Sequence, residues 1–187
     1  MLFRSSPLSK AAGGAFAVQS FHEERHKTLI VAGTADDEAA NEQTALALQK
    51  LIRTRWSNET VPIKTDRDVT DDDVQNHHLV LIGRPDSNLL TKRFRDSLPI
   101  AFGPRSFAFA GENYANAGSA VIAAADNPLN PRFSIVVLAG LSADATTRTP
   151  DLVFGPGTQG ADVVIAPLGG KVRALTVPSK ELTRKSN

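Results

Sequence analysis

The chain has 187 residues, a formal net charge of +1, 41% hydrophobic and 22% charged residues, and no cysteine. A charge balance this close to neutral does not favour nucleic acid or an anionic membrane surface as a partner, and no apolar run is long enough to span a bilayer. The lack of cysteine excludes a disulfide framework, a thiolate zinc site and a cysteine nucleophile. Length and composition fit one globular domain with a sizeable core.

Four short apolar runs each end at a glycine or at an Asp-Asn pair. They are Thr28–Ala32, Leu79–Ile82, Ala120–Ala125 and Ser134–Ala139. Runs of this kind predict buried strands of a parallel sheet. The loops that follow parallel strands meet at one edge of the sheet, where open α/β folds bind ligands. We therefore expect four adjacent, mainly parallel strands, with a candidate site formed by the loops after them.

Between residues 36 and 105, helical and strand patterns alternate. Apolar side chains at spacings of three and four, from Ala45 to Trp56, predict a long amphipathic helix. Thr70 followed by Asp73 resembles a capping box. The predicted elements are helices over Asp36–Trp56 and Asp71–Asn76, strands over Val61–Thr65 and His78–Ile82, and a helix after Asp86 or Ser87 whose buried face is Leu90, Phe94 and Leu98.

The second half of the chain adds a hairpin and several short elements. Phe107 and Phe109 alternate with small residues, which predicts a hairpin strand over Ser106–Ala110 that turns at 111–113. The segment Asn127-Pro128-Leu129-Asn130-Pro131 contains two prolines and predicts a rigid loop. The other predicted elements are a short helix after Gly140 that ends at Thr147, and strands over Leu152–Phe154, Val163–Ala166 and Val172–Val177.

Together these patterns predict an α/β fold of three layers, a flavodoxin-like open sheet of mainly parallel strands with a hairpin insertion. We expect residues 1–26 to form an amino-terminal arm and residues 27–178 to form a single domain. Residues 179–187 are polar, and we expect them to form a disordered tail.

Asp36 is the one candidate for a catalytic residue. It lies between a strand and an amphipathic helix, as in one unit of the α/β-hydrolase fold, where such a position can carry the acid of a triad. A triad also needs a nucleophile elbow, and no Gly-x-Ser-x-Gly pattern occurs in the sequence. His77 and His78 lead into a strand instead of following one. We therefore expect no complete triad, and we interpret Asp36 and Asp37 as helix caps.

His22 and His26 form the pattern His-Glu-x-x-His, which on a helix would place two zinc ligands on one face. The residues between them are charged, a strand begins almost at once, and no third ligand is evident. We interpret this segment as a solvated lead-in, and the acids at 71–73 as the start of a helix. We therefore predict no bound metal and no cofactor.

The predicted sheet edge carries polar residues that can bind a ligand. Arg84, Ser87 and Asn88 precede a helix, an arrangement that can hold a phosphate, although neither a Gly-x-Gly-x-x-Gly nor a Walker pattern is present. The candidate ligand-binding residues are Thr34, Arg84, Ser87, Asn88, Asn127 and Asn130. Two structural alternatives stay open: Arg84 pairs with Asp86 or Asp126, and the asparagines of the 127–131 loop satisfy the backbone of a turn.

Several segments resemble a carboxyl-terminal region of large bacterial serine peptidases and esterases of the α/β-hydrolase type. The most specific are Leu81-Ile82-Gly83-Arg84-Pro85-x-x-Asn88, and Asn127-Pro128-Leu129-Asn130-Pro131 followed by an apolar strand. The resemblance covers about residues 7–150. It implies a secreted or periplasmic parent enzyme in which such a region follows the catalytic part.

We therefore expect a non-catalytic accessory or interaction domain whose partner is a hydrolase catalytic domain. One alternative is a small-molecule-binding domain that uses the strand-end loops to hold a small polar ligand. Another is a hydrolase fragment that contributes Asp36 to a triad completed elsewhere. We expect no nucleic-acid partner and no membrane span.

Overall fold

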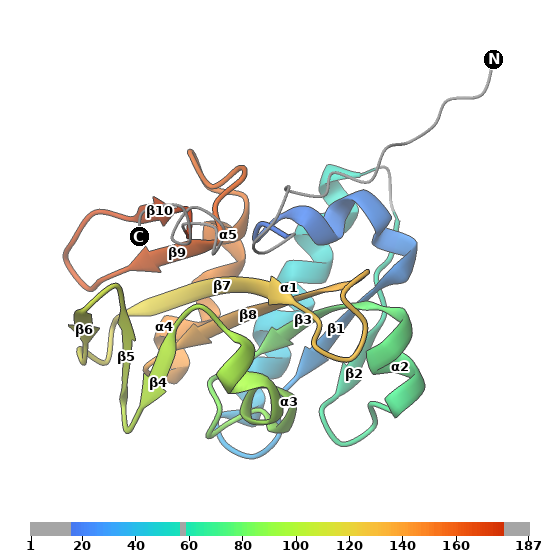
Figure 1. Cartoon of the computed structure of the whole chain (residues 1–187), viewed down its shortest axis with the longest axis horizontal. Helices are drawn as coiled ribbons and strands as arrows, with labels where there is room; N and C mark the ends of the chain where they lie inside the picture. Colours follow the sequence, from blue (N-terminus) through green and yellow to red (C-terminus); the bar gives the residue numbers. More distant parts are fainter. Residues whose placement is uncertain (1–15, 57–58, 178–187) are drawn as a thin grey trace, which may run out of the picture.

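A mixed seven-stranded sheet runs through the centre of the protein (Figure 1). The computed structural model describes residues 16–56 and 59–177. In chain order, the strands of this sheet are β1 (Thr28–Ala32), β2 (Ile63–Thr65), β3 (His78–Ile82), β7 (Ala120–Asp126), β8 (Ser134–Gly140), β9 (Val163–Ala166) and β10 (Arg173–Leu175). In space their order is β10-β9-β7-β8-β3-β1-β2.

Helical segments lie on both faces of the sheet. They are the 3₁₀ segments η1 (Ser20–Lys27) and η2 (Arg95–Ser97), and the α-helices α1 (Glu38–Arg55), α2 (Asp71–Asn76), α3 (Leu89–Phe94), α4 (Ala143–Thr147) and α5 (Thr149–Val153). The apolar residues of α2 and α3 pack into one core cluster, and those of η1, α1 and α5 pack into another. The protein is therefore a mixed α/β domain.

The two core clusters are separated by the sheet, because successive side chains of a strand point to opposite faces. Leu29 of β1 belongs to the cluster of α2 and α3, whereas Ile30 belongs to the cluster of α1. Leu48 and Ile52 of α1 are completely buried against the second cluster. This confirms the amphipathic helix and its core-facing stripe.

The four apolar runs are adjacent strands, as predicted, but they do not all run in one direction. β2, β1, β3 and β8 are parallel neighbours, whereas β7 is antiparallel to β8 and to β9, and β10 is antiparallel to β9. The prediction of mainly parallel strands therefore holds for β1, β3 and β8, and β7 is the exception. The physical reason is the length of its connection to β8: residues 127–133 can close a hairpin but cannot form the longer crossover that parallel strands require.

The packed part of the domain includes residues that we assigned to the arm. Val18 and Phe21 are completely buried, and the Val18 amide donates a 2.8 Å hydrogen bond to the Ala161 carbonyl. Residues 18–21 thus belong to the same core cluster as α1 instead of projecting from the domain. Most of the predicted arm, residues 1–15, and the predicted tail over 179–187 lie outside the described residues.

A second, smaller sheet has three antiparallel strands: β4 (Ala101–Gly103), β5 (Ser106–Phe109) and β6 (Glu112–Tyr114). The predicted hairpin is confirmed, but its turn is Ala110-Gly111, and both residues have positive φ. Phe107 is buried and stacks on Tyr114 with 4.9 Å between ring centroids.

Two short elements show where local patterns succeeded and failed. The capping box of α2 is confirmed, because the Asp73 amide donates to Thr70 Oγ1 and the Thr70 amide donates to Asp73 Oδ2. The strand predicted over Leu152–Phe154 is wrong. Those residues form the end and C-cap of α5, which begins at Thr149 and carries Pro150 in its first turn, where the fixed φ of proline suits a helix.

Candidate functional site

The carboxyl ends of β1 and β3 flank the point at which the direction of chain progression across the sheet changes. The chain passes from β1 to β2 on one side, and β3 and then β8 lie on the other side. In open α/β sheets, ligands bind in the crevice at such a point. We call the loops 33–37 and 83–88, which follow β1 and β3, the switch-point edge.

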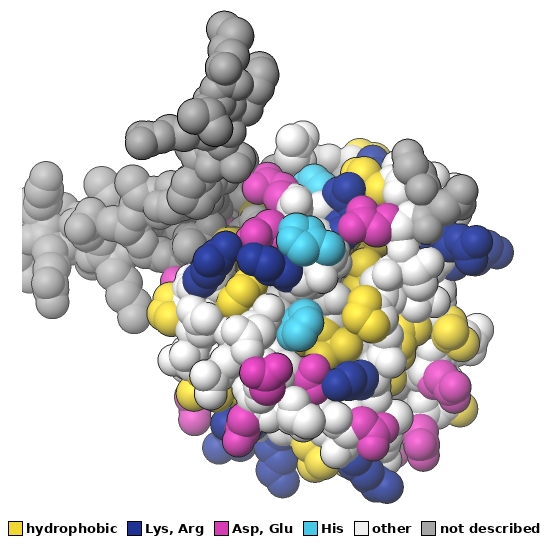
Figure 2. Space-filling model, turned by 90° about the vertical axis from the view of Figure 1, so that its right-hand side faces the viewer, with side chains coloured by type: hydrophobic (Ala, Val, Ile, Leu, Met, Phe, Trp, Pro, Cys, Tyr) yellow, Lys and Arg dark blue, Asp and Glu magenta, His cyan; other side chains and the backbone are white. Residues whose placement is uncertain are grey.

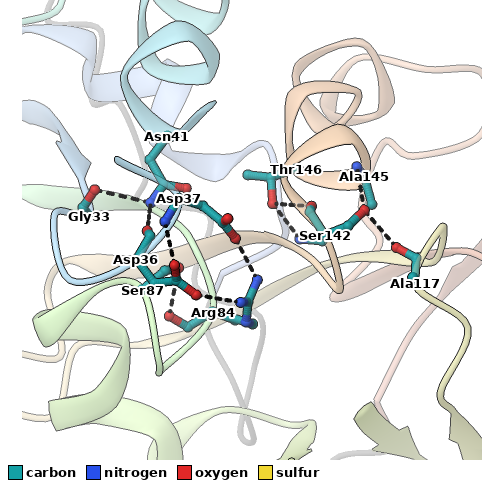
Figure 3. A network of polar contacts seen from close by, with 11 residues as sticks. Gly33, Asp36, Asp37, Asn41, Arg84, Ser87, Ala117, Ser142, Ala145 and Thr146 are labelled. Carbon is teal, nitrogen blue, oxygen red and sulfur yellow. Dashed lines mark hydrogen bonds and ion pairs between the residues drawn. The ribbon is translucent and has the colours of Figure 1, made fainter. Parts of the chain in front are cut away.

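Arg84 joins the two loops of the switch-point edge (Figure 3). Its Nη1 donates to Asp37 Oδ2 and its Nη2 donates to Asp36 Oδ2, both at 2.8 Å. The expected alternative partners, Asp86 and Asp126, are therefore not the carboxylates that hold it. Asp37 occupies the N-cap position of α1 but forms no side-chain cap hydrogen bond. The prediction that these acids cap α1 through their side chains is wrong, because Arg84 holds both carboxylates.

Asn88 and Ser87 are structural residues of this edge. Asn88 is completely buried; its Nδ2 donates to the Val31 and Ile82 carbonyls at the ends of β1 and β3. Its Oδ1 accepts the amides of residues 90 and 91, so Asn88 is the cap of α3 in place of the predicted Asp86 or Ser87. Ser87 is 1% exposed and donates to the Arg84 carbonyl at 3.2 Å.

An internal carboxylate occupies the position where we expected the anion of a ligand. Asp66 Oδ2 accepts the Leu89 amide, in the first turn of α3, at 2.8 Å. Asp66 Oδ1 accepts the Thr34 hydroxyl at 2.7 Å, and the Asp66 residue is only 4% exposed. Thr34 is therefore bound within the fold. Asp66 was missed by sequence reasoning, although its place directly after the β2 pattern was a signal, because β2 lies beside β1.

Two close backbone contacts hold the loops in this arrangement. A side chain at Gly33 would collide with the Ser87 carbonyl and with Asn88. Gly83 has a φ of 114°, a conformation that favours glycine, and a side chain there would meet Ser87 Oγ. The glycines that end β1 and β3 are therefore needed for the loops to meet.

Asn127 and Asn130 lie at the other edge of the sheet. This corrects the prediction that they join the switch-point edge, and it follows from the antiparallel direction of β7. Asn127 Nδ2 donates to the Val74 carbonyl at 2.6 Å, and Asn130 Nδ2 donates to the Gln75 carbonyl at 2.8 Å. Both side chains also accept backbone amides of their own loop. They tie this loop to the end of α2, which agrees with the structural alternative.

One polar atom at the switch-point edge has no partner. Asn41 of α1 is completely buried, and its Nδ2 donates to the carbonyls of Gly33 and Asp36 at 3.0 Å. Its Oδ1 accepts no hydrogen bond within the described residues. Both amide atoms lie close to the place that a side chain at Gly83 would fill. A buried acceptor without a donor costs free energy, so Asn41 Oδ1 is an unsatisfied polar atom beside this edge.

All four histidines lie away from Asp36. His22 and His26 belong to η1, which precedes β1, and His77 and His78 stand at the start of β3. Asp36 follows the carboxyl end of β1, at the opposite edge. No histidine of the described segments can therefore complete a triad with Asp36 in this fold.

A buried Ser–His–carboxylate contact chain exists at the amino-end edge of the sheet. Ser134 Oγ lies 2.9 Å from His78 Nδ1, and His78 Nε2 lies 3.3 Å from Glu24 Oε2. However, His78 Nδ1 also accepts the Ser134 amide at 3.0 Å, and Ser134 is completely buried. The rings of Phe16 and Phe133 pack edge-on against the imidazole. A substrate cannot reach this serine, so the contacts are structural.

The His-Glu-x-x-His pattern does not form a metal site. η1 is a 3₁₀ segment with a break at Glu24, so His22 and His26 do not share one α-helical face. His22 stacks on Trp56 with 5.0 Å between centroids. Within residues 16–56 and 59–177, no group of three or more His, Cys, Asp or Glu side chains is placed to hold a metal ion. On the face seen in Figure 2, histidine, acidic and basic side chains are intermixed, without a broad field of one sign.

Comparison with known proteins gives no assignment: no protein-family model matches the chain, and no curated protein matches it significantly. Among the described residues, no helix combines the length and apolar character needed to cross a membrane. The geometry of the two sheet edges is therefore the basis for the proposals below.

The buried His78 predicts a pH-dependent stability. Burial, the largest effect, lowers the pKa of His78 below its usual value of 6.5, although the hydrogen bond to Glu24 raises it in part. The unfolded chain therefore takes up a proton near pH 6.5, whereas the folded chain does so only at lower pH. We expect the contribution of neutral His78 to the free energy of unfolding to be fully present above about pH 6.5. It should be lost as the pH falls through the pKa of His78 in the folded chain.

Urea unfolding between pH 7.5 and pH 5 measures this loss. In the variant His78→Gln, which cannot titrate, the loss should be smaller than in the parent chain. The neighbouring substitution His77→Gln should retain the part of the loss that depends on His78. Equal losses in His78→Gln and in the parent chain would contradict the assignment.

Proposed function

We propose that this chain is a non-catalytic accessory or interaction domain of three layers and flavodoxin-like outline, related to secreted or periplasmic α/β-hydrolase-type serine peptidases and esterases. The strand order β2-β1-β3-β8 supports the fold proposal, since flavodoxin-like sheets begin with the order 2-1-3-4. The resemblance of about residues 7–150 to a region that follows a catalytic part supports the functional proposal. A hydrolase catalytic domain is the partner that this proposal implies.

The observation that carries the proposal is that the chemistry-bearing groups at both sheet edges are already bound to one another. At the switch-point edge, Arg84 holds Asp36, so the carboxylate of the candidate triad acid is engaged. At the amino-end edge, Ser134 and His78 are buried and no path leads a substrate to them. Catalysis by a triad needs an accessible nucleophile and a base that is free to take its proton.

The segments that carry the resemblance also have structural explanations. In the segment that ends β3, Arg84 and Asn88 join the neighbouring loop and strand ends. In the second segment, Asn127 and Asn130 bind the end of α2. These contacts join separate elements of the fold. A resemblance built on them supports a shared domain fold more than a shared active site.

The alternative in which Asp36 completes a triad with another part of a hydrolase requires a rearrangement. The carboxylate would have to leave Arg84, and Arg84 would then need another partner. Asp36 is the more exposed of the two acids that Arg84 holds, so it is the one that could exchange. Nothing else at this edge favours that exchange, and we therefore prefer the accessory role.

A serine-directed fluorophosphonate and a p-nitrophenyl ester test the absence of catalysis. We expect no labelling and no hydrolysis above background with the purified chain, because within residues 16–56 and 59–177 the one serine bound to a histidine, Ser134, is completely buried. Ser134→Ala and Asp36→Asn serve as matched controls for the two possible sources of activity. Labelling that disappears in Ser134→Ala, or turnover that disappears in Asp36→Asn, would contradict the proposal.

A second candidate function is the binding of a small polar ligand at the switch-point edge. The observation that favours it is Asn41 Oδ1, an acceptor without a donor in the described residues. Because this atom is completely buried, the loops 33–37 and 83–88 would have to open for a hydroxyl or an amide of a ligand to reach it. In NMR shift mapping with sugars, nucleotides and peptides, a ligand of this site should shift residues 33–37 and 83–88. Its affinity should change in Arg84→Ala and stay the same in Arg93→Ala, whose ion pair lies elsewhere. Shifts confined to the opposite edge would remove this candidate.

A further inference from the structure

A second candidate site is a pocket lined by two charged side chains that form no ion pair within the described residues. A pocket of about 310 Å³ lies between the last turns of α1 and the helix α5. It is lined by Leu51, Thr54, Arg55, Pro150, Asp151 and Phe154. Because α1 begins at the switch-point edge and ends here, the pocket is separate from that edge. Its volume is at the lower end of the range for small-molecule sites.

Arg55 provides the positive charge of this pocket. Its guanidinium lies over the ring of Phe154 at 5.3 Å and over the ring of Trp56 at 5.8 Å from the centroids. The two rings hold it in place by cation–π contact. It forms no ion pair with a carboxylate of the described segments, unlike the nearby Arg25, which pairs with Glu59. A positioned guanidinium without a carboxylate partner is a suitable receptor for an anion.

Asp151 provides the negative charge. It lies exposed in the first turn of α5, and in the described part of the chain its carboxylate has neither a hydrogen bond nor an ion pair. Although Arg55 and Asp151 line the same pocket, their charged atoms are not within the 4.0 Å of an ion pair. The pocket therefore presents two opposite charges that do not pair with each other.

The wall between these charges is mainly apolar. Leu51 is half-buried, Pro150 is buried, and Phe154 presents an aromatic ring. A simple anion would be repelled by Asp151, and a simple cation would be repelled by Arg55. A ligand that carries both charges and an apolar group satisfies all three features at once.

We infer that this pocket binds a small zwitterion with an apolar side chain. The carboxylate of the ligand binds Arg55, its ammonium binds Asp151, and its side chain packs on Leu51 and Phe154. Two sources share this chemistry: a free amino acid, and a short peptide with free termini. The inference does not depend on the accessory role proposed above. Because both charges face solvent, we expect a dissociation constant on the order of 1 mM.

NMR titration of the full chain with L-leucine and with the dipeptide Leu-Leu tests the inference. We expect saturable shifts of the amides at 51–55 and 151–154. The ligand that binds more tightly shows whether the pocket prefers a free amino acid or a short peptide, and either result supports the site. N-acetyl-leucine lacks the ammonium and leucinamide lacks the carboxylate, so both should bind at least about tenfold more weakly.

Two substitutions and their controls identify the binding residues. Arg55→Gln and Asp151→Asn should each weaken binding at least about tenfold, while the exposed neighbours Arg53→Gln and Asp144→Asn should leave it unchanged. Since Arg55 packs on aromatic rings, amide spectra must first show that Arg55→Gln keeps the fold. Absence of saturable shifts with both ligands, or shifts that survive both pocket substitutions, would overturn the inference.

Discussion

The arrangement of the switch-point edge depends on the side chain of Asn88. Its amide forms four hydrogen bonds: it donates to the Val31 and Ile82 carbonyls near the ends of β1 and β3, and it accepts the Leu90 and Thr91 amides in the first turn of α3. Strand ends and helix starts are the places where backbone groups lack partners within their own element. Asn88 supplies these partners for α3 and adds a second hydrogen bond at the Ile82 carbonyl, which also accepts the Gly33 amide, so one buried side chain links three elements.

The other polar contacts of this edge surround the junction that Asn88 forms between β1, β3 and α3. Gly33 allows the β1 loop to approach the backbone of Ser87, and Asp66 then reaches the first amide of α3. Arg84 closes the outer side by binding Asp36 and Asp37. An edge that in related architectures is free to receive a ligand is here filled largely by the chain itself, with the Asn41 Oδ1 as an exception. The proposed accessory role is based on this internal pairing of the polar groups.

Local sequence patterns predicted the elements well, because each depends on neighbours in the chain. The apolar runs, the stripe of α1 and the capping box at Thr70 are all of this kind. The direction of a strand in the sheet does not depend on local pattern alone, because it is set by the connection to the neighbouring strand. The sequence shows that the connection over 127–133 is short, but the apolar run before Asn127 has the same pattern as the runs that end at glycine. That pattern carries no strand direction, so the sequence predicts Asn127 at the wrong edge.

The partners of the candidate site residues could not be read from local patterns. Arg84 meets Asp36 across 48 positions, and His78 meets Ser134 across 56. Thr34 and Asp66 come together only because β2 lies beside β1. Single-sequence reasoning identified most of the polar residues at the edge but not which of them would satisfy one another, since this depends on tertiary packing.

The central claim is that the polar residues of the switch-point edge hold the fold together. The free energy of unfolding of the variant Asn88→Ala tests it most directly. Removing the side chain leaves the Leu90 and Thr91 amides without their cap and takes one hydrogen bond from each of the Val31 and Ile82 carbonyls. We therefore expect a loss of about 2 kcal/mol or more. The exposed Asn113→Ala should change the value by about 0.5 kcal/mol or less. If Asn88→Ala unfolds at the same urea concentration as the parent chain, Asn88 is not the structural junction, and the account is contradicted.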